Sequence, residues 1–238
     1  MAVNSSKLGF ISGSWLKLIA VVSMLIDHTA HILWRDAPAM AEALLIFGGQ
    51  EVSAYWLARK IGRLAFPIFC FLIGEGWRHT RSKMKYICNL GLFAVISEIP
   101  FNLMMSGNFA YAGKQNVFVT LLLGLLLIWI YEWNCKDFWK AIGFLGIVAC
   151  AIMLKADYGL AGAILVLVMY ALSNKPAMRA IISYPLLSGG TAAFCAFLPI
   201  SLYNGKRGFI QSRWLKYAFY LFYPLHILIL LGIRKILI

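Results

Sequence analysis

Acidic residues are scarce in this chain, and charged residues of either sign are few. The 238 residues include 9 Asp and Glu against 22 Lys and Arg, and only 13% are charged. Soluble domains carry about 25% charged residues. A hydrophobic fraction of 62% and a mean hydropathy of +0.79 therefore indicate an integral membrane protein. No basic segment of domain size lies outside the apolar stretches, so we expect no nucleic-acid partner.

Paired cysteines and hydrolase motifs are also missing. The five cysteines are isolated and form no CxxC pair, which favours neither a zinc site nor a disulfide framework. We therefore expect no bound metal. The chain lacks a GxSxG element, and its Asp residues form no obvious dyad, which argues against an intramembrane protease. The cysteines are Cys70, Cys88, Cys135, Cys150 and Cys195.

Long apolar stretches dominate what is present. A transmembrane helix needs about 20 apolar residues, and the sequence has room for about eight. We predict an all-α polytopic membrane bundle, a single domain over residues 1–238, with helices around a central polar cavity. The mixed segment 36–58 is expected to form a short interfacial helix and a loop. The predicted helices are 14–34, 59–79, 85–105, 116–134, 138–155, 158–173, 177–202 and 214–237.

Basic loops predict the orientation. The run 78–85 is the densest, and cytoplasmic loops of membrane proteins are enriched in Lys and Arg. We therefore expect the N-terminus, the C-terminus and this run in the cytoplasm. The basic loop 203–216 breaks the rule, because eight spans would put it outside. Either its charge has a local purpose there, such as an anionic acceptor or lipid phosphate, or 177–202 turns back and returns the loop to the cytoplasm.

The first helix contains ionisable residues at membrane depth, where such groups indicate function. Lys17 and His28 are eleven positions apart, which on a helix returns to nearly the same face about 16 Å further along. Asp27 is adjacent to His28 and can fix its tautomer and raise its basicity. Their side chains diverge by about 100° on a helix, so Asp27 has the alternative of meeting a basic group on another helix. A snorkelling lysine and a hydrogen-bonded histidine are the plainer interpretation.

Other polar groups lie within or near the apolar helices. Glu98 stands just before Pro100 within an apolar run, and turn or cap roles are the alternative for Asn116 and Asp157. An aromatic belt is the alternative for the tyrosines of the last helix. The full set is Arg63, Glu98, Asn116, Asp157, Tyr223 and His226.

Eight short segments between residues 16 and 226 follow one another in an order that resembles the TraX family of bacterial membrane proteins. That family is associated with N-terminal acetylation of conjugative pilin, and it is similar to the acyltransferase-three membrane enzymes. In those enzymes a basic residue, ten intervening positions and a histidine mark the first helix, as Lys17 and His28 do here. The matching segments are 16–20, 25–28, 62–69, 97–100, 115–118, 157–162, 202–208 and 220–226.

The resemblance implies an acetyltransferase of the bacterial cytoplasmic membrane. His28 would be the catalytic base with Asp27 beside it, and acetyl-CoA would be the co-substrate, without a metal. The acceptor would be an amine or hydroxyl of a peptide, pilin or glycan, and membrane lipid would surround the protein. The residues expected at the coenzyme are Lys17, Arg63, Lys206 and Arg207, with Arg63 alternatively orienting Asp27. Those expected to support the substrate are Glu98, Asn116, Asp157, Tyr223 and His226.

A non-catalytic small transporter or a membrane assembly factor is the alternative function. Transporters also place charged groups near the bilayer midplane and use broken helices. The sequence shows no clear inverted repeat, which favours the enzyme.

Overall fold

The computed structural model describes residues 9–237, and these residues are mostly helical. Their contacts divide them into two units. We call residues 9–68 and 189–237 the terminal unit, because both ends of the described chain contribute to it, and residues 69–188 the central unit. Helix α4 (Ala65–His79) begins in the terminal unit and continues into the central unit.

The terminal unit contains the first and last long helices. Helix α1 continues directly into the π-helical turn η1, and the last helix, α12, contains Pro224 in its interior. Between them the chain forms short helices and one hairpin of two antiparallel strands. The elements are α1 (Gly13–Thr29), η1 (Ala30–Trp34), α2 (Pro38–Ala41), β1 (Ala43–Phe47), β2 (Gln50–Ser53), α3 (Ala54–Gly62), α10 (Gly190–Phe194), α11 (Phe197–Ser201) and α12 (Arg213–Leu237).

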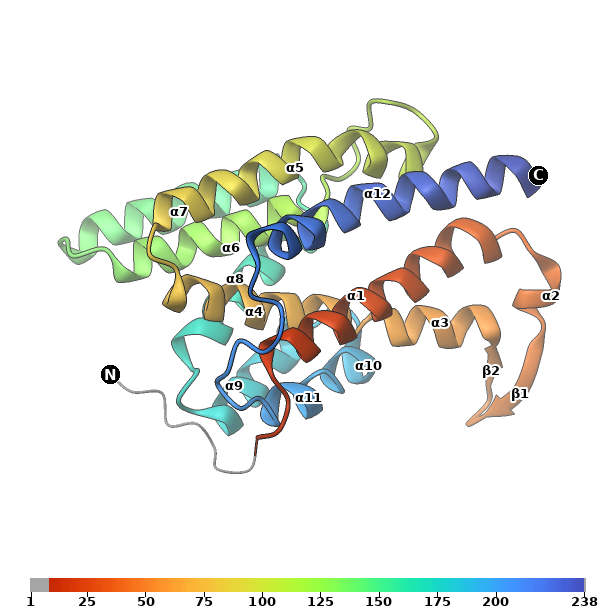
Figure 1. Ribbon diagram of the computed structural model, residues 1–238, viewed down its shortest axis with the longest axis horizontal. Helices are drawn as coiled ribbons and strands as arrows, with labels where there is room; N and C mark the ends of the chain where they lie inside the picture. The colour runs from red at the N-terminus through yellow and green to blue at the C-terminus, as the bar shows by residue number, and fades with distance from the viewer. Residues whose placement is uncertain (1–8, 238) are drawn as a thin grey trace. The chain divides into compact units, whose positions relative to one another are not determined.

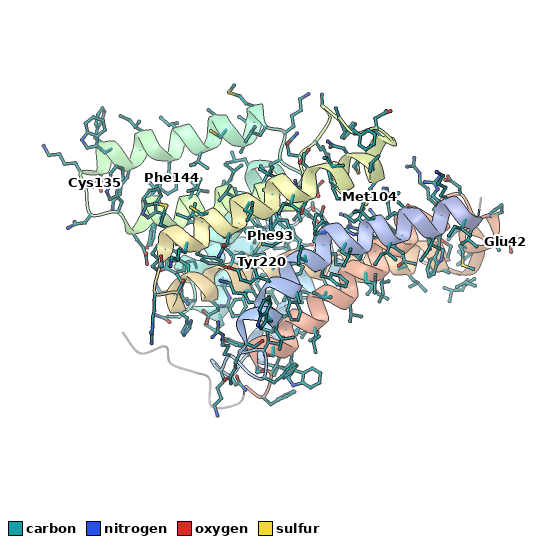
Figure 2. The ribbon with its side chains drawn as sticks, turned by 45° about the horizontal axis from the view of Figure 1, so that its top comes forward. Glu42, Phe93, Met104, Cys135, Phe144 and Tyr220 are labelled. Carbon is teal, nitrogen blue, oxygen red and sulfur yellow. The ribbon has the colours of Figure 1, made fainter. Side chains whose placement is uncertain are left out.

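Helices α1 and α12 lie side by side and run in the same direction (Figure 1). Before α1, Ile11 forms a parallel bridge with Tyr203, close to the loop that leads into α12. At the other end of the pair, Arg234 Nη2 lies 2.6 Å from Asp36 Oδ2. Figure 2 labels Tyr220 near the beginning of α12, and Glu42 lies beyond its last turns. Residues about 200 positions apart in the sequence therefore form one helix pair.

The central unit consists of consecutive helices. Glycine allows α6 and α8 to approach closely, since a Cβ at Gly124 would lie 2.5 Å from Val166 Cβ. Small residues at helix contacts are typical of membrane bundles. The turn between α6 and α7 contains Cys135, and Phe144 follows on α7 (Figure 2). The elements after α4 are α5 (Lys83–Ser106), α6 (Val117–Glu132), α7 (Asp137–Met153), α8 (Gly159–Ala171), α9 (Pro176–Ser183) and η2 (Tyr184–Leu186).

Most predicted helices agree with the structure to within a few residues, and three segments differ. The predicted helix 59–79 is two helices, α3 and α4, separated by a turn at Arg63 and Leu64. The predicted span 177–202 is broken into α9, η2, α10 and α11, which agrees with the alternative that this segment is not one simple span. Segment 36–58 contains a hairpin that we did not predict. Its turn residues Gly48 and Gly49 both have positive φ, 59° and 79°, as a two-residue hairpin turn requires.

Within residues 9–237, three helices are long and apolar enough to cross a membrane. They are Gly13–Trp34, Lys83–Ser106 and Trp214–Leu237. Three shorter apolar helices are Val117–Glu132, Gly159–Ala171 and Gly190–Ser201. These lengths support a membrane protein, but they do not confirm about eight spans around a central cavity.

Candidate functional site

A pair of histidines joins the first and last helices of the terminal unit. His28 Nδ1 on α1 lies 2.6 Å from His226 Nε2 on α12. The two rings differ by 3° in orientation, and their centroids are 4.9 Å apart. This separation equals the nitrogen-to-nitrogen distance plus about one ring radius on each side. The two rings must therefore lie edge to edge in one plane, which is the geometry of a hydrogen bond rather than of stacked rings.

The hydrogen bonds of His226 fix the direction of proton donation. His226 Nδ1 lies 2.6 Å from the carbonyl oxygen of Phe222, which can only accept. Nδ1 of a neutral His226 is therefore protonated, and its Nε2 accepts. It follows that His28 donates from Nδ1 and keeps an unprotonated Nε2, the form that a general base requires. Tyr223, a buried residue one turn of α12 from His226, has its ring centroid 5.8 Å from that of His28.

Asp27 faces a different helix from His28. Its Oδ2 lies 2.6 Å from Arg59 Nη1 on α3. The absence of a side chain at Gly62 makes room for it, since a Cβ there would lie 2.3 Å from Asp27 Cβ. The alternative that Asp27 meets a basic group on another helix is confirmed. The group at His28 Nδ1 is His226, so an imidazole occupies the position that the other alternative gave to the Asp27 carboxylate.

Arg59 was missed as the partner of Asp27. The sequence places Arg59 and Arg63 one helical turn apart, and periodicity alone does not choose between them. Arg63 lies in the turn after α3, where a Cβ at Gly189 would be 2.9 Å from both its Cβ and its Cγ. Glycine at 189 therefore allows the stem of Arg63 to pass the start of α10.

Basic residues gather at the beginning of α1. The backbone N–H groups of Gly13 and Ser14 donate to the carbonyl oxygens of Lys206 and Arg207, at 2.8 and 2.9 Å. The buried Ser14 hydroxyl donates to the same Arg207 carbonyl at 2.8 Å. Arg207 and Lys216 lie close enough to Lys17 for their positive charges to repel its ammonium group. We name Lys17, Lys206, Arg207 and Lys216 the basic end of the terminal unit.

The basic end explains the loop that broke the orientation rule. Because the loop is hydrogen-bonded to the first turn of α1, it lies at the same end of that helix as Lys17. This is the arrangement expected if 177–202 is broken and returns the chain to the end at which α1 begins. Because α12 runs in the same direction as α1 (Figure 1), Arg234 lies at the opposite end of the pair from Lys17. This contradicts our expectation that both termini lie in the cytoplasm. The side of the membrane on which the basic end lies stays a prediction. Lys216 was not among our candidates, although its place at the start of the last helix pointed to this end.

Three candidates lie in the central unit. Asn116 is fully buried and caps α6 by accepting from the Phe118 N–H at 3.0 Å. Its Nδ2 also donates to Glu98 Oε2 at 2.6 Å, so these two residues are joined by a hydrogen bond that the sequence did not predict. Asp157 Oδ1 lies 3.6 Å from Lys114 Nζ. The cap role of Asn116 is thus present, while a substrate role for the three stays a prediction.

Among the described residues, no group of three or more His, Cys, Asp and Glu side chains is arranged to hold a metal ion. The site has histidine, tyrosine and a separate cluster of cations. Such a set can move a proton at one place and attract an anion at another.

Both units are thus parts of a helical membrane protein, with a histidine pair between its first and last helices. Residues 12–234 match the family described as TraX protein. The chain belongs to the TraX family. It is also similar to a protein of Dichelobacter nodosus described as the probable fimbrial assembly protein FimC, serogroup H1. The two are 28% identical over 252 residues, which cover 93% of this chain and 95% of the relative. No solved structure matches the chain.

Proposed function

We propose that this protein is a membrane acetyltransferase that moves an acetyl group from acetyl-CoA to an amine, with the N-terminus of a pilin-like peptide as the favoured acceptor. Membership of the TraX family and the fimbrial assembly relative support a pilin-related role. The observation that carries the catalytic part is the His28–His226 pair, which leaves His28 Nε2 as a base. A hydroxyl acceptor would use the same chemistry.

In the proposed transfer, one carbon–nitrogen bond forms, one carbon–sulfur bond breaks, and one proton moves from the amine to the thiolate. The neutral amine nitrogen attacks the thioester carbonyl carbon, and His28 Nε2 takes the proton that the nitrogen loses. The carbon–sulfur bond then breaks, and the CoA thiolate leaves with that proton. An α-amino group has a pKa of about 8, so roughly a fifth of the acceptor is neutral at physiological pH and can attack. The products are an acetylated amine and CoA with a free thiol.

His226 orients His28 in the same way as the third residue of a catalytic triad orients its histidine. Its Nε2 accepts from His28 Nδ1–H, and the Phe222 carbonyl holds His226 in the tautomer that can accept. This contact orients the base and stabilises the imidazolium that forms, as a carboxylate does in serine hydrolases. Tyr223, whose ring lies beside His28, is the candidate donor for the oxyanion.

The basic end lies at a suitable distance for the donor. Lys17 and His28 are separated by about 16 Å along α1. The pantetheine arm of CoA contains about as many backbone bonds as four residues and spans roughly 15 Å when extended. Phosphates held by Lys17, Arg207 and Lys216 would therefore leave the thioester near His28. Arg207 and Lys216 are close enough to Lys17 for their positive charges to repel it, and such a group of cations is suited to a ligand with several negative charges.

A non-catalytic assembly factor is the second candidate, favoured by the description of the D. nodosus relative. The two candidates differ in one measurement. Purified full-length protein is incubated with radiolabelled acetyl-CoA and a pilin-like peptide that has a free N-terminus. The control peptide has the same sequence and a blocked N-terminus. Label on the first peptide alone supports N-acetyl transfer, and label on neither supports the assembly factor.

The matched variants are His28→Ala and His79→Ala. We expect His28→Ala to lose about 10²–10⁴-fold in rate, as removal of a general base does. His79 belongs to the central unit and bonds to the carbonyl of Glu75, so His79→Ala should keep the wild-type rate. Full activity in a folded His28→Ala protein would overturn the role of His28.

A further inference from the structure

Helix α9 of the central unit contains a deeply buried arginine that the proposed transfer does not use. Arg179 is only 5% exposed, and its guanidinium carbon lies 5.1 Å from the centroid of the Phe71 ring on α4. Burial lowers the pKa of the Arg179 guanidinium, and the Glu75 carboxylate raises it. Helix α9 has eight residues and is too short to cross a membrane.

Two buried donors of α9 have no hydrogen-bond partner within residues 9–237. They are Nε of Arg179 and the hydroxyl of Ser183, which is 0% exposed. The two residues are four positions apart, so they share one face of the helix. A buried donor left without an acceptor costs about 1–3 kcal/mol, more if it is charged. An acceptor that meets both donors would remove this cost.

The charges around Arg179 do not cancel. Within the described residues, the charged groups that act on it are Glu75 and Arg78. Glu75 Oε1 already lies 2.9 Å from Arg78 Nη1, so one carboxylate serves two guanidinium groups. Glu132, another carboxylate of this unit, accepts from Trp77 Nε1 at 2.7 Å and lies 3.9 Å from Lys83 Nζ. The group formed by Glu75, Arg78 and Arg179 therefore retains one positive charge.

A bound water could satisfy the two donors, but it would leave this charge uncompensated. Burying an unpaired charge is far more costly than burying an unpaired neutral group. A ligand with one negative charge and two acceptor oxygens corrects both defects. A phosphodiester has this composition, and arginine forms strong charge-assisted hydrogen bonds with phosphate oxygens.

We propose that Arg179 and Ser183 form a buried binding site for a monoanionic phosphodiester, with Nε–H of Arg179 and the hydroxyl of Ser183 as its donors. Two ligands offer a phosphate with one negative charge and two free oxygens: the phosphodiester headgroup of a glycerophospholipid, and either phosphate of the pyrophosphate bridge of CoA. The site consists of residues of the central unit and shares none with the basic end. It does not depend on the proposed acetyl transfer, because phosphodiester binding and transfer are measured independently.

Calorimetry on purified, delipidated full-length protein tests the site. One titration uses CoA, a second uses short-chain phosphatidylglycerol, and a third uses diacylglycerol, which lacks the phosphate. We expect the phosphatidylglycerol or the CoA to bind, and the diacylglycerol to bind at least tenfold more weakly than the phosphatidylglycerol. Loss of one hydrogen bond to a charged group corresponds to about 10–100-fold in affinity. Ser183→Ala should therefore bind its ligand at least about tenfold more weakly.

Arg179→Lys keeps the charge but loses the Nε–H donor, and it should also weaken the ligand about tenfold. Met178→Ala is the matched control, because that side chain is on the same helix and is 46% exposed; its affinity should equal the wild-type value. The ligand whose affinity falls in these variants, CoA or phosphatidylglycerol, identifies the source of the phosphate. If neither ligand binds the wild type, or if folded Ser183→Ala and Arg179→Lys bind both ligands normally, the proposal is wrong.

Discussion

The two units differ in how far apart in the sequence their polar partners lie. In the terminal unit, His28 pairs with His226 and Asp36 pairs with Arg234, each across 198 positions. In the central unit the partners lie closer together in the sequence: Trp77 meets Glu132 across 55 positions, and Glu98 meets Asn116 across 18, at the first turn of α6. Contacts between neighbouring helices can position a helix, whereas the longest-range pairs bring together the two ends of the chain. The proposed catalytic groups are all in the first kind of unit.

The largest expected effect concerns the long-range histidine pair. We expect His226→Ala to lower the transfer rate about 10–100-fold while leaving the donor affinity unchanged, because His28 would keep its nitrogen base but lose its orienting partner. Steady-state rates with varied acetyl-CoA separate the two quantities. The replacement Asn116→Ala removes the short-range pair instead and should lower thermal stability more than rate. An equal loss of rate in both variants would break the distinction between the units.

Stability should respond to the close approach of Asp27 to α3. A methyl group at residue 62 would lie 2.3 Å from Asp27, so Gly62→Ala should lower the free energy of unfolding by about 1–3 kcal/mol. Gly146 on α7 has nothing within 4 Å of such a methyl group. Gly146→Ala should therefore be neutral or stabilise by up to about 1 kcal/mol. Thermal unfolding in detergent measures both, and a neutral Gly62→Ala would contradict the described contact.

Donor affinity should depend on Lys17 more weakly, because other cations share the same end of α1. We expect Lys17→Ala to bind CoA about tenfold more weakly by calorimetry, with Lys17→Arg retaining part of the affinity. A double variant Lys17→Ala/Arg207→Ala should lose more than either single change. Unchanged affinity in all three would remove the basic end from the donor site.

The last prediction concerns the side of the membrane on which the basic loop of each unit lies. In a background without native cysteines, cysteine at Arg81 or at Gln211 should be shielded from an impermeant thiol reagent in intact cells. Labelling only at residue 211 would show that the basic loop of the terminal unit faces outward. It would then meet an acceptor or lipid rather than a cytoplasmic donor. Labelling of residue 81 would reverse the predicted orientation.

The helices of the central unit were largely predictable because their information is local. Continuous apolar runs and the cap residue Asn116 fixed α6, and glycine at 107 in the left-handed conformation ends α5. The hairpin at 43–53 was missed although Gly48 and Gly49 stand between two strand-forming runs. The mixed composition of segment 36–58, with charged residues, a proline and two glycines, favours a short helix and a loop instead. The arginine pair at 59 and 63 gave two possible partners for Asp27, and only packing chose Arg59.

By itself, the sequence determined that the chain is a helical membrane protein and that Lys17 and His28 share one face of its first helix. Both follow from composition and from the 3.6-residue period, which are local properties. Only the tertiary structure decided that His28 meets His226, that Asp27 meets Arg59, and that the 203–211 loop binds the start of α1. These contacts join segments as much as 198 residues apart, and helical periodicity specifies which face a residue occupies but not which helix packs against that face.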